Sequence, residues 1–121
     1  MQYRLVSGAA LAGLLQSALA SNYNLVENYQ GSNFFQKMGF YTGGDPTHGY
    51  VQYVDQGTAQ NNGLISLSGN TVYMGVDHSN VASGSGRQSV RVVSQRAYTH
   101  MLVTIDIEHM PSSICGVWPA L

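Results

Sequence analysis

The β character of this chain is clearest in LISLSGNTVYMGV, residues 64–76. Two runs of aliphatic, β-branched and aromatic residues flank Gly69 and Asn70, and such a pair favours the two-residue turns of β-hairpins. We therefore expect strands at 64–67 and 71–76, joined by a tight turn around Gly69-Asn70.

Further strands are expected on either side of this hairpin. The residues at 50–54 and 89–94 are rich in Val and Tyr, and 99–109 is the longest alternating run. In that run the more apolar face is predicted to point toward the core; it contains Met101, Val103, Ile105, Ile107 and His109. Turn-rich segments at 42–46, 60–63 and 82–86 separate the strands, and no amphipathic helix is predicted after Ala20. Short strands between such turns predict an all-β fold, an antiparallel sandwich or barrel.

The first twenty residues have the pattern of a secretory signal peptide. Arg4 precedes an apolar run at 5–15, and Ala18-Leu19-Ala20 supplies small residues at a cleavage site, so we expect cleavage after Ala20 and a secreted product. The apolar run is shorter than the roughly 20 residues that span a bilayer, so no stable membrane anchor is expected. The alternative is a short buried helix that begins a cytosolic domain. The remaining residues, 21–121, have the length of one small domain.

Composition narrows the classes of ligand. Charged residues make up 9% of the 121 residues, and the formal net charge is −1. A chain without a basic patch is a poor match for nucleic acid. The four histidines lack metal-site spacing, and no cofactor motif is present, so neither a metal nor a cofactor is expected. A surface of Ser, Thr, Asn, Gln, Tyr and Gly suits neutral, hydroxyl-rich ligands such as glycans.

The chain has a single cysteine, Cys115, near its end. In a secreted protein an odd cysteine indicates either a partner elsewhere or a reactive thiol. A small buried hydrophobe is the remaining interpretation. We favour a disulfide partner downstream of Leu121.

Six stretches, in order along the chain, resemble a known enzyme family. They are YQGSNFF (29–35), DPTHGYVQYVD (45–55), YMGVD (73–77), GRQSVRV (86–92), HMP (109–111) and CGVWPA (115–120). Together they resemble the amino-terminal part of secreted fungal glycoside hydrolase family 16, the endo-β-1,3(4)-glucanases and laminarinase-like proteins. The resemblance implies a jelly-roll, concanavalin-like antiparallel β-sandwich whose partner is a β-glucan polysaccharide held in a cleft.

The resemblance also implies a retaining mechanism, which needs two carboxyl groups about 5–5.5 Å apart. The family carries them in a Glu-x-Asp-x-x-Glu pattern, which these residues do not contain. We expect that pattern beyond Leu121, so that residues 21–121 form an incomplete sandwich with open edges and no hydrolase activity of their own. The alternative is a non-catalytic, secreted glucan-binding module.

One pair of carboxylates in this sequence has a spacing similar to that of a catalytic pair. Asp106 and Glu108 share a face of the expected strand at 99–109, about 6.6 Å apart along it. Thr104 stands where the family has its first Glu, and the spacing to the last acid differs. We therefore interpret Asp106 and Glu108 as solvated or cleft-wall acids rather than as catalytic residues.

Three residues are candidates for substrate binding. Arg91 matches an arginine that contacts glucan in the family, and its guanidinium is a multiple hydrogen-bond donor. Gln52 stands where relatives commonly carry Asn. Trp118 offers an aromatic face for a sugar ring, although a core position is the interpretation we favour, because the family's cleft tryptophan lies further along the chain.

Overall fold

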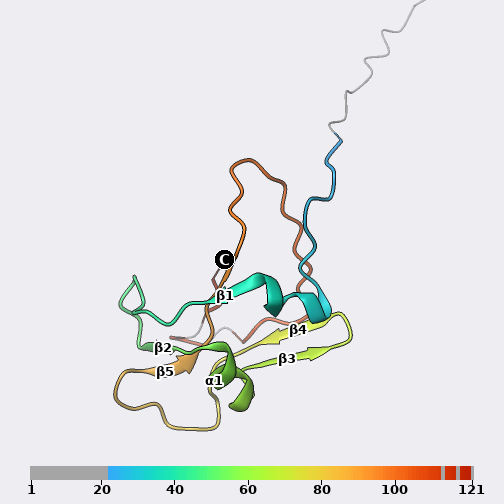
Figure 1. Ribbon diagram of the computed structural model, residues 1–121. Coiled ribbons are helices and arrows are strands. Elements are labelled where there is room, and N and C mark those ends of the chain that lie inside the picture. Colours follow the sequence, from blue (N-terminus) through green and yellow to red (C-terminus); the bar gives the residue numbers. More distant parts are fainter. Residues whose placement is uncertain (1–21, 113, 117, 121) are drawn as a thin grey trace, which may run out of the picture.

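The fold consists of three short β ladders gathered around one small core (Figure 1). In this computed structural model, residues 22–112, 114–116 and 118–120 are described. The predicted signal peptide, Met1–Ala20, lies outside these residues. The elements are two 3₁₀ turns, one α-helix and six strands: η1 Gly31–Asn33, η2 Phe35–Lys37, β1 Met38–Phe40, β2 Val51–Tyr53, α1 Gln56–Asn61, β3 Ile65–Ser68, β4 Thr71–Met74, β5 Arg87–Ser89 and β6 Val92–Ser94.

The predicted hairpin forms as expected. β3 and β4 pair antiparallel from Ile65 opposite Met74 to Ser68 opposite Thr71. Gly69 has φ +57° at the first position of the two-residue turn, where a positive φ is required and glycine accepts it without strain. The hairpin register therefore follows from local sequence alone.

The other two ladders join segments that are distant in the sequence. β1 pairs antiparallel with β6, and β2 pairs parallel with β5 from Val51 opposite Arg87 to Tyr53 opposite Ser89. The parallel pair departs from the wholly antiparallel pairing that we expected. Gly86, just before β5, is needed for this approach, because a Cβ there would lie 2.6 Å from the Val51 nitrogen.

Two expectations about local structure are wrong, and one short helix was not predicted. The segment at 89–94 is not one strand, because Val90 and Arg91 interrupt it between β5 and β6. The helix that was not predicted is α1, which begins where the Asp55 side chain caps it by accepting from the Thr58 N–H at 3.0 Å. Residues 99–109 form no strand, and their apolar side chains are exposed rather than directed to the core. This segment has no neighbouring strand to complete its hydrogen bonds, and alternation cannot replace one.

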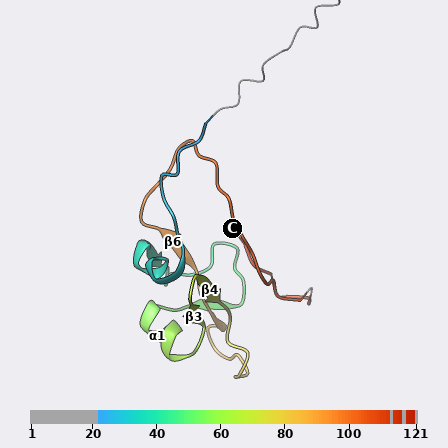
Figure 2. The same ribbon diagram turned by 90° about the vertical axis from the view of Figure 1, so that its right-hand side faces the viewer.

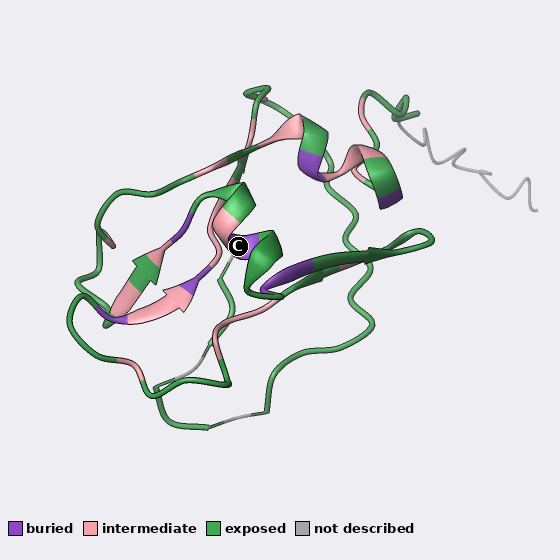
Figure 3. Cartoon of the chain, turned by 60° about the horizontal axis from the view of Figure 1, so that its bottom comes forward, coloured by how far each residue is buried: buried purple, intermediate pink, exposed green. Residues whose placement is uncertain are grey.

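The core is small and lies between α1, the hairpin and η2. Its buried members are Phe35, Val54, Ala59, Leu64 and Ile65. Figure 3 shows how few buried positions there are, with most of the ribbon coloured as exposed. Phe35 packs on Phe40, with ring centroids 5.8 Å apart, and thereby connects η2 and β1 to the core.

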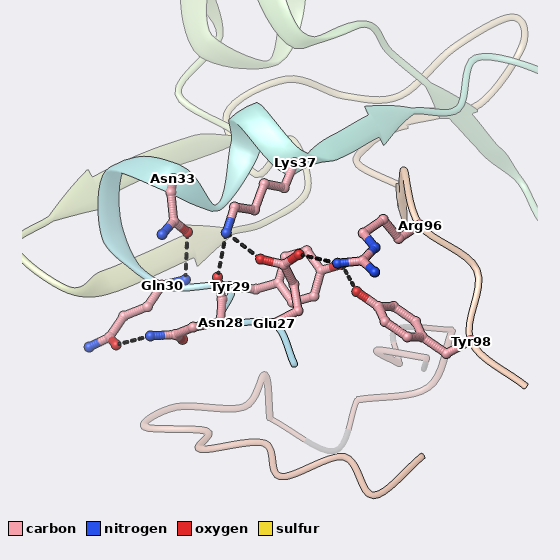
Figure 4. A network of polar contacts seen from close by, with 8 residues as sticks. All are labelled: Glu27, Asn28, Tyr29, Gln30, Asn33, Lys37, Arg96 and Tyr98. Carbon is pink, nitrogen blue, oxygen red and sulfur yellow. Dashed lines mark hydrogen bonds and ion pairs between the residues drawn. The ribbon is translucent and has the colours of Figure 1, made fainter. Parts of the chain in front are cut away.

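The segment before η1 is attached to the segment after β6 (Figure 4). Glu27 accepts from Lys37 Nζ and pairs with Arg96 at 3.2 Å. The hydroxyls of Tyr29 and Tyr98 lie 2.8 Å apart. Figure 2 shows the two segments extending beyond the ladders in the same direction.

Candidate functional site

Arg91 lies in the interruption between β5 and β6, where two tyrosine rings hold its guanidinium. Its Cζ is 4.7 Å from the ring centroid of Tyr41 and 5.8 Å from that of Tyr53. The two rings meet edge to face, with centroids 5.8 Å apart. Arg91 is half-buried, and cation–π attraction to rings in this position restrains it. We call Arg91, Tyr41 and Tyr53 the arginine–tyrosine cluster.

The cluster combines donors with aromatic surface. No carboxylate among the described residues forms an ion pair with Arg91. Its guanidinium thus remains able to donate to the hydroxyl groups of a ligand. Tyrosine rings provide the apolar faces that a ligand with both polar and apolar surface needs. This combination suits a neutral, hydroxyl-rich ligand with an apolar face better than a small anion, which would use the guanidinium but not the rings.

Tyr41 and Tyr53 lie on either side of the loop at 42–50, the first directly after β1 and the second at the end of β2. Tyr41 follows β1, where its N–H donates to the Arg91 carbonyl at 2.9 Å. Tyr53 ends β2, and its hydroxyl donates to Asp45 Oδ1 at 3.1 Å. Burial, and then the hydrogen bond to the Asp45 carboxylate, raise the pKa of Tyr53. The phenol therefore stays a neutral hydrogen-bond donor to a higher pH than an ordinary tyrosine.

Gln52 lies in a separate, polar hollow of about 370 Å³. Gln88, its partner in the β2–β5 register, lies beside it and accepts from Asn62 Nδ2 at 2.7 Å. Asp77 also lines the hollow, and its pKa is lowered, first by the Asn80 side chain and then by the Ser79 N–H. Amide side chains give the hollow both donors and acceptors for hydroxyl groups.

The structure does not bring Gln52 and Arg91 together. Gln52 and Tyr53 are successive residues of β2, so their side chains leave the strand on opposite faces. Arg91 accompanies Tyr53, while Gln52 accompanies Gln88. Two surfaces result, the arginine–tyrosine cluster and the amide hollow, where one set of binding residues was expected.

Trp118 is 70% exposed, so the core position that we favoured for it is wrong. It has no strand or helix to hold it, because residues 118–120 are irregular. The Cys115 thiol is free and exposed in the part of the chain that the structure describes. Burial as a small hydrophobe, one of the three interpretations of this cysteine, is therefore wrong.

Asp106 and Glu108 lie on the exposed, irregular segment at 99–109. Glu108 Oε1 accepts from the Thr71 hydroxyl at 3.1 Å, on the outside of the hairpin. That contact orients Glu108 toward a β4 side chain rather than toward Arg91.

Sequence reasoning missed Tyr41, Tyr53 and Asp45. The signal for Tyr53 was present, since period-2 alternation in β2 places it on the face opposite Gln52. Tyr41 and Asp45 had no comparable signal, because their positions depend on how the loop at 42–50 closes.

Two further observations on the described part of the chain concern membrane-spanning helices and metal sites. None of its helices has the length and apolarity to cross a bilayer. Within the same residues, no group of three or more His, Cys, Asp and Glu side chains is placed to hold a metal ion.

Residues 38–121 match a family model described as the XgeA-like, catalytic GH16 domain. An endo-1,3(4)-β-glucanase of Arthroderma benhamiae is 45% identical over 114 residues, which is 94% of this chain and 25% of that protein. A probable endo-1,3(4)-β-glucanase of Aspergillus niger is 47% identical over 118 residues, 95% of this chain and 16% of that protein. The chain thus spans a quarter or less of the length of these curated relatives.

Solved structures of the same family also resemble this chain. A GH16 β-1,3-glucosyltransferase described as elongating superposes with a TM-score of 0.67 at 43% identity, covering 71% of this chain and 30% of that one. Laminarinase 16A of Phanerochaete chrysosporium, solved with β-glucans in donor and acceptor sites, superposes with a TM-score of 0.61 at 43% identity, covering 64% of this chain and 26% of that one. These likenesses confirm the expected jelly-roll fold class.

Proposed function

The chain belongs to glycoside hydrolase family 16, in its XgeA-like group, and from this we propose that its residues form part of the β-glucan-binding cleft of a retaining endo-β-1,3(4)-glucanase. The observation that carries the proposal is the family match over residues 38–121, supported by relatives named as endo-1,3(4)-β-glucanases. The arginine–tyrosine cluster is the part of the structure best suited to this substrate.

The geometry supports a binding role for these residues. A pyranose ring has an apolar face and a rim of hydroxyls, and the cluster offers tyrosine rings beside a guanidinium that has no carboxylate partner among the described residues. The amide hollow around Gln52 supplies further neutral donors and acceptors. Trp118, exposed and aromatic, is a third contact that we propose for the same polysaccharide.

Bond cleavage is not proposed for the 121 residues themselves. A retaining mechanism needs a nucleophile and an acid/base at about 5–5.5 Å, and these residues contain no Glu-x-Asp-x-x-Glu. Purified chain is expected to release no reducing sugar from laminarin. Release that disappears in Glu108→Gln would overturn this part of the proposal.

Binding is tested with Arg91→Gln and laminari-oligosaccharides in isothermal titration calorimetry. Loss of charged donors weakens affinity roughly tenfold or more. Arg96→Gln is the matched control, because Arg96 also faces a tyrosine ring, that of Tyr98 at 5.7 Å, but lies outside the cluster. Equal losses in the two variants, or no saturable binding by the parent chain, would contradict the proposal.

A second candidate function is a non-catalytic, secreted glucan-binding module, and the observation that favours it is the pairing of a guanidinium with two tyrosine rings in the arginine–tyrosine cluster. Saturable binding without hydrolysis by the protein isolated from its source would support it. Hydrolysis by that protein would instead support the glucanase.

We also propose that the protein is secreted, on the sequence pattern of Met1–Ala20. Expression in a eukaryotic host that secretes proteins should place it in the medium with Ser21 as its first residue. Amino-terminal sequencing of the product measures this, and retention in the cell with Met1 intact would contradict it.

A further inference from the structure

The loop at 42–50, between β1 and β2, is folded around the carboxylate of Asp45. Oδ2 accepts from the Gly49 N–H at 2.8 Å and from the Thr47 hydroxyl. The Asp45 carbonyl accepts from the His48 N–H at 3.0 Å. The Thr47 hydroxyl is the main cause that lowers the pKa of Asp45, followed by the Gly49 N–H, so the carboxylate is charged at neutral pH. This one side chain closes the loop on itself.

The other carboxylate oxygen points out of the loop to the arginine–tyrosine cluster. Oδ1 accepts from the Tyr53 hydroxyl at 3.1 Å, and the ring of Tyr53 lies 5.8 Å from the Arg91 guanidinium. Asp45 is therefore linked to Arg91 through the Tyr53 side chain, which is hydrogen-bonded to one and lies beside the other.

Tyr41 connects the same loop to Arg91 by a second route. Its hydroxyl donates to the Gly44 carbonyl at 2.9 Å, one residue before Asp45, and its ring is 4.7 Å from the guanidinium. Both rings that hold Arg91 are thus hydrogen-bonded to the loop at 42–50.

We propose that Asp45 is a positioning residue, which orients the Arg91 guanidinium through Tyr53 before glucan binds. The expected consequence is a higher affinity for β-glucan, and this consequence rests on the proposed function. An arginine side chain has many rotamers, and ordering it in advance removes an entropic cost that binding would otherwise carry. Asp45 itself does not touch the polysaccharide.

The test compares Asp45→Asn and Tyr53→Phe with the control Asp55→Asn. Asp55 is closely matched, since it accepts from one backbone N–H and one threonine hydroxyl, both of Thr58, yet contacts no tyrosine. Asp45→Asn removes the charge of the acceptor and Tyr53→Phe removes the donor, and each is expected to weaken laminari-oligosaccharide binding about three- to tenfold. Asp55→Asn should bind as the parent does.

Two readouts separate positioning from general destabilisation. The side-chain protons of Arg91 feel the ring currents of Tyr41 and Tyr53, so their NMR shifts should move toward random-coil values in Asp45→Asn and Tyr53→Phe but not in Asp55→Asn. The losses of affinity should not add in the double variant, because both substitutions interrupt one path. Tyr53→Phe keeps the ring and tests the path even where Asp45→Asn fails to fold.

The outcomes are distinct. Unmoved Arg91 shifts in both variants, or additive losses of affinity, would overturn the positioning role. If the parent shows no saturable binding, the proposed function fails, while the shifts still decide whether Asp45 orients Arg91.

Discussion

Residues 64–76 and residues 99–109 have similar sequence patterns and different structures. Both alternate apolar and polar positions in runs rich in Val, Ile and Thr. The first forms β3 and β4 and buries Leu64 to 2% exposure, whereas the second forms no strand and leaves Ile105 52% exposed. The same pattern thus has opposite outcomes in one chain.

The difference lies in where the partner strand comes from. The hairpin brings its two strands together across Gly69-Asn70, so the backbone N–H and C=O groups that face the partner strand are paired at little cost in loop closure. The segment at 99–109 needs a strand from elsewhere, and exposed backbone is solvated by water until one is present. Pairing, rather than alternation, decides which segment becomes a strand.

The sharpest test of this difference compares Leu64→Ala with Ile105→Ala. Truncating Leu64 in the core is expected to lower the free energy of unfolding by about 2–5 kcal/mol. Ile105→Ala, at an exposed position, should change it by no more than about 0.5 kcal/mol. Denaturant unfolding measures the free energy of unfolding of both variants. Comparable losses of stability would mean that the side chains at 99–109 are packed against the rest of the protein.

A smaller effect on stability is expected from the ion pairs that lie just before the segment at 99–109. Glu27→Gln weakens the pairs with Lys37 and Arg96 that hold the chain just before residue 99. Hydrogen bonds from Lys37, the larger cause, and from Arg96 lower the pKa of Glu27 from 4.5. Because the folded pKa is the lower one, this contribution is present above pH 4.5 and is lost as the pH falls through the folded pKa. Limited proteolysis at residues 94–98, followed against pH, should show this loss in the parent chain.

Glu108→Gln is the control for that experiment, since it makes the same change on an exposed side chain away from Lys37 and Arg96. Its proteolysis profile should follow the parent chain. A Glu27→Gln profile that matches the parent at every pH would show that the ion pairs do not hold this segment.

The smallest effect is expected for the hydrogen bond that joins the two segments. Thr71→Val keeps the side-chain volume and removes the hydroxyl that donates to Glu108 at 3.1 Å. This bond is exposed, so the free energy of unfolding should change by less than about 0.5 kcal/mol. Thermal unfolding measures it, and a larger loss would mean that 99–109 stabilises the hairpin from outside.

Local patterns predicted a substantial part of the fold. β2, β3 and β4 lie where composition and alternation placed them, and the hairpin turn is the expected one. α1 was missed because six residues are too few for a periodic apolar face, and its signal is the cap at Asp55. The parallel β2–β5 pair was missed because it joins residues about 36 apart, and no local pattern specifies such a pairing.

The candidate site was also predicted from the sequence only in part. Arg91 and Gln52 were identified from a family resemblance, and the structure places each on a polar surface. That they lie on opposite faces of β2 follows from the β2–β5 register and from the interruption at Val90 and Arg91. The path from Asp45 to Tyr53 to Arg91 exists only once the loop at 42–50 has closed.

The amino-acid sequence by itself determined the β class, the hairpin with its turn, and membership of glycoside hydrolase family 16, because these depend on neighbouring residues or on motif order. The tertiary structure alone decided which alternating runs become strands, and which side chains share a surface. Backbone pairing and side-chain packing between distant segments depend on the whole chain. The segment at 99–109 demonstrates this, as a strand in pattern that remains exposed without a partner.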